Sequence, residues 1–115
     1  MGVVTDNCLF CRIVAGEIPA DVVTRTDRVL AFRDIAPVAP THVLVIPLEH
    51  HRDMASLVEA DADLAAEVLA VAAQLGADLE GGYRVVFNTG ADGGQAVFHV
   101  HAHVLGGRQL AWPPG

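Results

Sequence analysis

A chain of 115 residues, 52% of them hydrophobic, is long enough for one core and too short for two domains. Its formal net charge is −7 and its seven basic residues, all arginine, are scattered, which argues against a nucleic-acid partner, because such partners need clustered cations. The lack of lysine excludes a P-loop lysine and a Schiff-base lysine. No run approaches the roughly 18 apolar residues of a membrane span, and no secretory signal is visible at the N-terminus, so we expect a cytoplasmic protein without a membrane partner.

We expect a flexible tail over residues 1–6 and a single domain over 7–115. At the start of that domain, Asp6 or Asn7 is placed to cap a short helix over 8–14, because a side-chain oxygen there can accept the free N–H groups of the first turn. Gly16 would end this helix.

Short apolar runs bounded by turn residues predict three strands, over 22–25, 28–33 and 42–46. The third strand is apolar at every position after His42, which indicates burial on both faces of a sheet. The loop before it, 34–40, contains two prolines that restrict its backbone.

The middle of the chain predicts one long helix over 62–79, with Asp61 as its cap and two glycines beyond its end. A single helical turn is predicted just before it, over 56–59. The apolar residues of the long helix recur at spacings of three and four and form one stripe that faces a core: Leu64, Ala65, Val68, Leu69, Ala72, Leu75 and Leu79.

Two more strands are predicted near the C-terminus, over 83–87 and 97–105, joined by a glycine-rich loop over 88–95. Five short strands with one long helix and one short N-terminal helix indicate an α+β fold. In such a fold an antiparallel sheet carries a helix on one face.

The last predicted strand contains three alternating histidines, His99, His101 and His103. Because alternate residues of a strand project from one face, they are predicted to form a row. Such a row can hold a metal, bind a phosphate, or supply a nucleophile with its proton-transfer partners. We disfavour a purely structural row, because stacked imidazoles repel once they are protonated.

This pattern resembles the signature of the histidine triad (HIT) family. Similarity to the HINT branch of that family extends over about residues 8–115, including segments 31–35 and 39–47. The resemblance implies a five-stranded antiparallel HIT sheet and a homodimer with one continuous sheet, to which the C-terminal tail contributes. The flanking segments that carry the resemblance are Asn88-Thr89-Gly90, Asp92-Gly93-Gly94-Gln95, Gly106-Gly107-Arg108 and the terminal Trp112-Pro113-Pro114-Gly115.

The resemblance also implies a reaction. His101 corresponds to the family's nucleophile, which forms a covalent nucleotidyl-histidine that water then hydrolyses. His103 would hold the phosphate and assist the leaving group, while His99 or His42 would fix the tautomer of His101. Ala96 stands where better-known HINT proteins have a serine that contacts the leaving group, so protonation of that group would differ here.

A nucleotide pocket follows from the same resemblance. Asn88 and Gly94 correspond to residues that contact the phosphate, and glycine-rich loops are able to present N–H groups to anions. Asp34 would accept hydrogen bonds from both ribose hydroxyls. The apolar positions that match the nucleoside pocket, each of which core packing also explains, are Phe10, Ile13, Phe32, Ile35 and Leu44.

Cys8 and Cys11 form a Cys-x-x-Cys pair, and two thiolates on one helical turn supply half of a tetrahedral zinc site. The neutral nitrogens available to complete it are on His50 or His51 and on His99. HIT proteins with this pair bind structural zinc through two cysteines and two histidines, so the resemblance implies zinc on Cys8, Cys11, His50 and His99, with no organic cofactor. Two reduced buried thiols are the alternative, and the absence of a following βαβ pattern argues against a redox pair.

The function that we expect is hydrolysis of purine nucleoside 5′-phosphoramidates or acyl-nucleotides to the nucleoside monophosphate. A dinucleoside polyphosphate hydrolase of the other HIT branch is the nearest alternative. A nucleotide-binding partner protein with weak catalysis, or a metal-binding module that uses the histidine row as ligands, also remains open. The third histidine argues against the nucleotidyltransferase branch, which has glutamine there.

Overall fold

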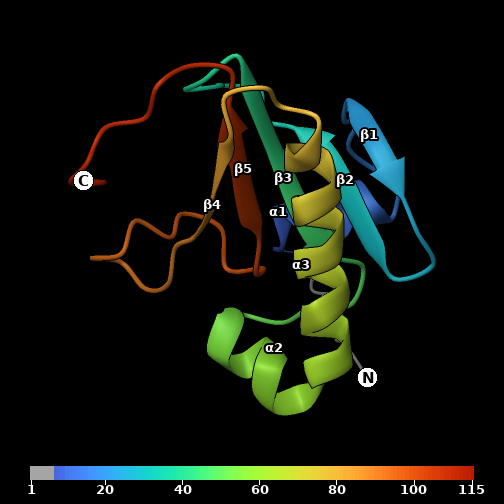
Figure 1. Ribbon diagram of the computed structural model, residues 1–115. Coiled ribbons are helices and arrows are strands. Elements are labelled where there is room, and N and C mark those ends of the chain that lie inside the picture. The colour runs from blue at the N-terminus through green and yellow to red at the C-terminus, as the bar shows by residue number, and fades with distance from the viewer. Residues whose placement is uncertain (1–6) are drawn as a thin grey trace.

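The computed structural model describes residues 7–115, so the tail expected over 1–6 lies outside it. No helix in this described range is both long and apolar enough to cross a membrane. The helices and strands follow one another as in Figure 1: α1 (Leu9–Val14), β1 (Val22–Arg25), β2 (Val29–Arg33), β3 (Thr41–Pro47), α2 (Met54–Ala60), α3 (Ala62–Ala77), β4 (Tyr83–Phe87) and β5 (Ala102–Gly106).

The strands form one antiparallel sheet in the order β1-β2-β3-β5-β4, which confirms the predicted α+β fold. The central strand β3 is buried along nearly its whole length, because its apolar residues alternate between two layers. Val43 and Val45 belong to the layer under α3. Leu44 and Ile46 belong to the layer under α1, which is the side of the sheet that carries His42 and His103.

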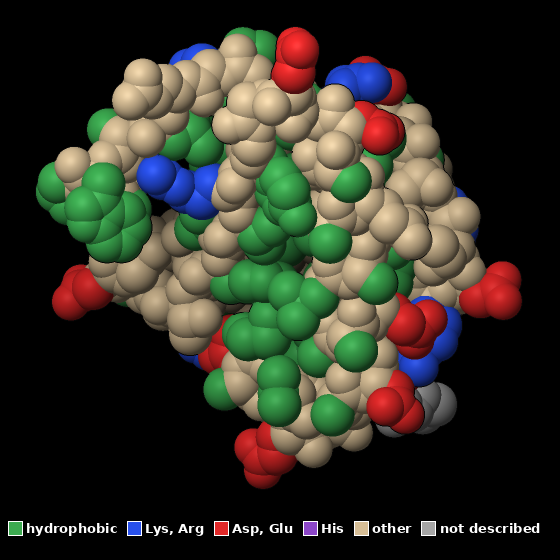
Figure 2. Space-filling view, in the orientation of Figure 1, with side chains coloured by type: hydrophobic (Ala, Val, Ile, Leu, Met, Phe, Trp, Pro, Cys, Tyr) green, Lys and Arg blue, Asp and Glu red, His purple; other side chains and the backbone are tan. Residues whose placement is uncertain are grey.

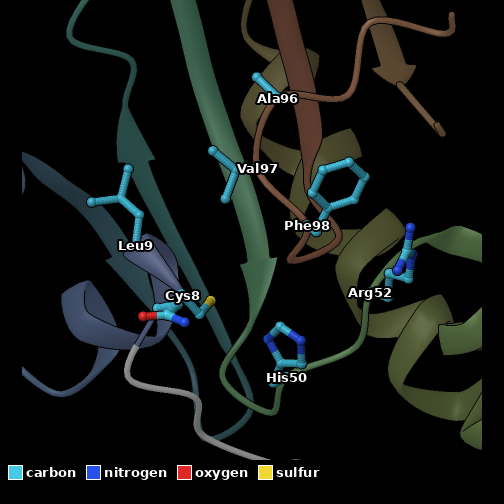
Figure 3. Close-up of a pocket in the computed structure, with 8 residues that line it drawn as sticks. Cys8, Leu9, His50, Arg52, Ala96, Val97 and Phe98 are labelled. Atoms are coloured by element: carbon cyan, nitrogen blue, oxygen red, sulfur yellow. The ribbon is translucent and has the colours of Figure 1, made fainter. Parts of the chain in front are cut away.

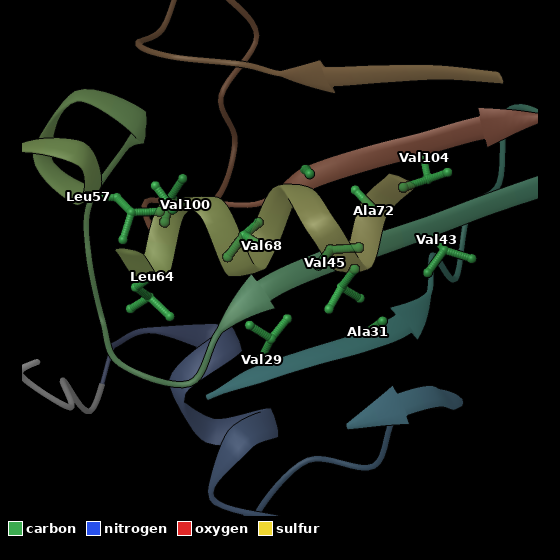
Figure 4. Packing of buried hydrophobic residues seen from close by; sticks show 13 residues of the cluster. Val29, Ala31, Val43, Val45, Leu57, Leu64, Val68, Ala72, Val100 and Val104 are labelled. Atoms are coloured by element: carbon green, nitrogen blue, oxygen red, sulfur yellow. The ribbon is translucent and has the colours of Figure 1, made fainter. Parts of the chain in front are cut away.

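Helix α3 lies across one face of the sheet, and its buried residues pack into the core there (Figures 1 and 4). Leu64 and Val68 are fully buried there. The Asp61 carboxylate caps the helix as predicted, accepting the N–H of Leu64 at 3.0 Å. Leu69 departs from the predicted stripe, since it is 48% exposed, and the helix ends at Ala77 rather than at 79.

Both shorter helices differ from the prediction at their starts. The cap of α1 is Cys8 rather than Asp6 or Asn7, and its sulfur accepts the N–H of Cys11 at 3.1 Å. Helix α2 has seven residues rather than a single turn. It begins earlier because Asp53 caps it, accepting the N–H of Ser56 at 2.9 Å.

The last strand is shorter than the alternation predicts, spanning only Ala102–Gly106 instead of 97–105. Before Ala102 the chain bonds to the last residue of β3 and to the loop after it. Val100 N–H donates to the carbonyl of His51 at 2.7 Å, and His99 Nε2 lies 2.9 Å from the carbonyl oxygen of Pro47. Of the three histidines only His103 therefore lies in a strand, so the predicted strand is too long. The predicted row is nevertheless present: Val100, Ala102 and Val104 pack under α3, while the rings of His99 and His101 contact Phe10 on the opposite side.

Candidate functional site

His101 lies where the irregular segment enters β5, and its proton position follows from its partner. Nδ1 is 2.8 Å from the carbonyl oxygen of His99, and because a carbonyl only accepts, Nδ1 carries the proton. No group within residues 7–115 hydrogen-bonds to Nε2, so its lone pair is unused. Burial lowers the pKa of His101 below its usual value, and the neutral imidazole is therefore the form present near pH 7.

His42 and His103 form a second hydrogen-bonded pair. They meet because β3 and β5 place Leu44 opposite His103, and His42 is two residues along the same face. Val38 N–H donates to His42 Nδ1 at 3.1 Å, so the His42 proton is on Nε2, which lies 2.9 Å from His103 Nδ1. His103 must accept there and carry its own proton on Nε2.

That Nε2 of His103 is buried and has no hydrogen-bond partner in the described part of the chain. Buried polar atoms without partners are rare and costly, so this N–H is positioned for something that the protein alone does not supply. Burial also lowers the pKa of His103 to about 4, which keeps the ring neutral near pH 7. A single neutral N–H donor therefore faces the site.

The two rings differ in the group that each presents. His101 offers a lone pair on Nε2 and His103 an N–H on Nε2, and their ring centroids are 5.0 Å apart. A nucleophile beside a donor is suited to attack at phosphorus, with the donor bonded to a phosphoryl oxygen or to the leaving group. The ring of Phe10 packs edge-on against His101 at 5.1 Å and helps to hold it in place.

Asp34 approaches this network from the loop before β3. Its Oδ1 accepts the N–H of Ala36 at 2.8 Å, and its Oδ2 lies 3.4 Å from His42 Nε2. Asp34, His42 and His103 are close enough together to be considered as metal ligands. However, ligation through His42 Nε2 would require the proton to move to Nδ1, which faces the N–H of Val38, so the arrangement disfavours a metal there.

The positions predicted to line a nucleoside pocket are only partly brought together. Phe10, Phe32 and Leu44 share one buried cluster, with Ile13 packed against it, and the two phenylalanine rings meet edge-to-face at 5.5 Å. Ile35, by contrast, is fully exposed on its loop and is not part of this cluster.

The loop after β4 is organised by Gln95, a residue without a predicted role. Its side chain accepts the N–H of Gly90 at 3.0 Å and donates to the carbonyl of Arg52 at 2.8 Å, and it is only 5% exposed. Gly94 adopts a φ of 85°, which favours glycine, and a Cβ there would lie 3.9 Å from the Asn88 side chain. Asn88 and Gly94 are thus neighbours, as a shared phosphate contact requires.

Cys8, Cys11, His50 and His99 converge at the start of α1. The cysteine sulfurs lie 3.4–3.5 Å from the histidine Nδ1 atoms, and the Nδ1 atoms of His50 and His99 are 3.3 Å apart. A tetrahedral zinc ion with ordinary bond lengths requires about 3.6 Å between S and N ligands and about 3.3 Å between N ligands. The four donor atoms therefore fit a zinc ion, and His51, the other candidate, instead pairs with Glu49 at 2.8 Å.

The protonation of the cluster also suits a metal. The His99 Nε2–H donates to Pro47, so Nδ1 is unprotonated, and an outer hydrogen bond of this kind is typical of metal-bound histidine. Burial lowers the pKa of His99 to about 4 and lowers the pKa of His50 as well.

Cys8 and His50 border a hollow of about 460 Å³ that Ala96, Val97 and Phe98 also line (Figure 3).

Comparisons with known proteins give consistent matches. A family model of the HIT domain matches residues 15–110. An uncharacterized HIT-like protein of Synechococcus elongatus is 51% identical over 96% of this chain and 99% of its own length. A 14 kDa zinc-binding protein of Zea mays is 46% identical over 93% of this chain and 87% of its own length.

Solved structures agree. A HIT family hydrolase from Legionella pneumophila superposes with a TM-score of 0.88 at 52% identity, covering 95% of this chain and all of that one. A histidine triad nucleotide-binding protein from Candida albicans superposes with a TM-score of 0.79 at 32% identity, covering 93% of this chain and 83% of that one.

Proposed function

The chain belongs to the HIT domain family, and from this premise we propose that it hydrolyses purine nucleoside 5′-phosphoramidates or acyl-nucleotides to the nucleoside monophosphate. Hydrolase chemistry is supported at the family level by two structural neighbours that are HIT family hydrolases.

One observation carries the proposal: the free lone pair of His101 beside the unpartnered N–H of His103. Two hydrogen-bond networks that start from main-chain groups set opposite tautomers on neighbouring rings. If the histidine row bound a metal, both rings would need a lone pair directed at the ion. If the row were purely structural, every buried N–H would have a hydrogen-bond partner.

The reaction has two displacements. In the first, the His101 Nε2 lone pair forms a bond to phosphorus while the P–N or P–O bond to the leaving group breaks. The leaving group departs with the bonding electrons and takes a proton from a water molecule, while the neutral His103 keeps its Nε2 proton and donates it in a hydrogen bond to a phosphoryl oxygen. In the second, the hydroxide left from that water attacks phosphorus and the bond to His101 breaks. Each step is easier than direct attack of water on an anionic phosphorus.

Other parts of the site would bind the nucleotide. The cluster of Phe10, Phe32 and Leu44 supplies an apolar wall for the base, while Ile13 packs beside it. Asp34 would accept from the ribose hydroxyls, since each carboxylate oxygen retains a lone pair beyond those used by Ala36 and His42. Asn88 and Gly94 would contact the phosphate. Ile35, which is fully exposed, could contribute only from the rim.

We also infer that Cys8, Cys11, His50 and His99 hold a structural zinc ion. When bound, zinc with four protein ligands has no open position for water and supplies stability rather than catalysis. The zinc-binding protein of Zea mays, at 46% identity, supports this inference.

A homodimer is the assembly that we propose. Strand β4 is an edge of the sheet, and edge strands expose unpaired main-chain groups that another strand can use. Hydrophobic side chains gather on the surface between β4 and α3 (Figure 2). Among the exposed large hydrophobic residues, Leu69 of α3 is 48% exposed and Tyr83 of β4 is 42% exposed. Trp112 in the C-terminal tail is 81% exposed, as expected for a residue that packs against a second copy.

The test is amine release from a fluorogenic adenosine phosphoramidate by three proteins: the unmodified chain, His101→Ala and the matched control His51→Ala. We expect turnover by the unmodified chain and the control, and none by His101→Ala, while all three bind adenosine monophosphate. Equal turnover by all three would refute the role of His101. Nucleotide binding without turnover would favour the nucleotide-binding alternative, and preferential cleavage of a dinucleoside polyphosphate would favour the other HIT branch.

A further inference from the structure

We propose that the cluster of Cys8, Cys11, His50 and His99, when it holds zinc, positions the nucleophile through the main chain of His99. The inference rests on the proposed role of His101, and it adds a coupling between the zinc cluster and the nucleophile that the reaction alone does not require. In this view zinc binding and the chemistry at phosphorus are energetically linked, although zinc touches no reacting atom.

His99 takes part in both sites through different atoms. Its side chain is fully buried, with Nδ1 at 3.4 Å from the Cys8 sulfur and 3.3 Å from His50 Nδ1. Its carbonyl oxygen is the acceptor for His101 Nδ1–H at 2.8 Å. Fixing the side chain of His99 therefore restricts the group that sets the tautomer of His101.

The sheet does not hold this carbonyl in place. The β3–β5 ladder ends at the pair Val45 and Ala102, so residues 99–101 lie outside it. The His99 side chain bonds to Pro47, the last residue of β3, and the Val100 N–H donates to His51, which follows His50 in the loop after β3. The four candidate ligands thus join three separate stretches of chain, and zinc would cross-link them where regular secondary structure does not.

A second contact runs from the same cluster to the nucleophile. Phe10 lies between Cys8 and Cys11 in the sequence, and its ring packs edge-on against both His101 and His99, with centroids at 5.1 and 6.0 Å. Ligation of the two cysteines would therefore also fix the ring that supports His101.

Loss of zinc has a specific expected consequence. If the His99 carbonyl shifts, His101 can place its proton on Nε2 instead of Nδ1, and that tautomer has no lone pair directed at phosphorus. Nucleotide binding uses other groups, so kcat should fall while KM stays nearly constant. His99 is in this sense a positioning residue.

The test compares zinc-loaded protein, protein from which a chelator has removed zinc, and protein to which zinc has been restored. The ring nitrogens of His101, labelled with ¹⁵N, report the tautomer directly by NMR, without turnover. We expect the Nδ1–H tautomer in the loaded protein, a mixture after removal, and recovery on zinc addition. We also expect kcat to fall at least about fivefold on removal, the lower end of typical coupling between sites. His50→Gln should reproduce the loss, whereas His51→Gln, its neighbour outside the cluster, should not.

The outcomes separate this inference from the proposed function. A folded zinc-free protein with an unchanged His101 tautomer and unchanged kcat would overturn the inference and leave the function intact. A zinc-dependent tautomer in a protein without turnover would uphold the coupling and remove the function. Global unfolding of both the zinc-free protein and His50→Gln would also overturn it, because the cluster would then be a folding element rather than a positioning one.

Discussion

Replacing His42 by phenylalanine tests the hydrogen-bonded chain that sets the proton on His103. His42 is 7% exposed and joins Val38 N–H to His103 Nδ1 through its two ring nitrogens. Phenylalanine is an aromatic replacement without either nitrogen. His103 Nδ1 would lose its donor, and its ring would be free to place the proton on Nδ1 instead of on Nε2.

The magnitude follows from what is left without a partner. Val38 is 60% exposed, so water can replace His42 as the partner of its N–H at little cost. His103 Nδ1 is left unsatisfied in a largely buried site, which costs about 1–3 kcal/mol of the free energy of unfolding. If the His103 Nε2–H donates to a phosphoryl oxygen in the transition state, kcat should fall by about a hundredfold, the lower end of the effect of removing one such donor, with KM nearly unchanged.

Urea denaturation measures the loss of stability, and steady-state release of a fluorescent amine measures kcat and KM. His51→Phe is the matched control, since His51 pairs with Glu49 outside this chain, and its kcat should stay at the wild-type value. If His42→Phe retains kcat within about twofold of wild type, or if the loss is confined to KM, His42 does not set the proton on His103.

Three further predictions concern packing, metal and pH. Gly76→Ala should lower the free energy of unfolding by about 1–3 kcal/mol, because a Cβ at Gly76 would lie 2.3 Å from the Tyr83 ring. The control is Gly81→Ala, where a Cβ meets nothing within 4 Å, and its urea midpoint should be almost unchanged. Cys11→Ser should abolish the one zinc ion per chain expected by elemental analysis and lower Tm, and equal zinc content in both proteins would contradict the assigned ligands. The pKa of His103 is about 4 in the folded chain against 6.5 in a free side chain, so as the pH falls the unfolded chain binds the proton first. The free energy of unfolding should therefore fall as pH drops from about 6.5 to about 4. Urea titrations should show a shallower fall for His103→Gln, and the same dependence of stability on pH in both proteins would count against the lowered pKa of His103.

Much of the scaffold was predictable because local patterns determine it. The apolar run of β3 alternates between two buried layers, and the stripe on α3 with its Asp61 cap has the helical period, so both elements form where the sequence predicts them. The Cys-x-x-Cys spacing within one helical turn likewise predicted the pair at the start of α1. Residue type and spacing were sufficient in these cases.

The start of β5 was not predictable from local pattern. Alternating apolar residues and histidines look the same whether the main chain bonds to β3 or to the loop after it. Here the main-chain bond from Val100 to His51, in that loop, decides the outcome. The partner of His42 was missed for the same reason, because strand register rather than spacing brings it to His103. Gln95 gave no signal either, since its role depends on a buried side chain that reaches Arg52 across the fold.

The central claim is a covalent nucleotidyl intermediate on His101, and the stereochemical course at phosphorus tests it most directly. A single diastereomer of an adenosine 5′-phosphorothioate amide would be hydrolysed in ¹⁸O-labelled water and the configuration of the product determined by ³¹P NMR. Two displacements, each with inversion, predict net retention of configuration. Net inversion would mean that water attacks the substrate in a single step, and it would contradict the account.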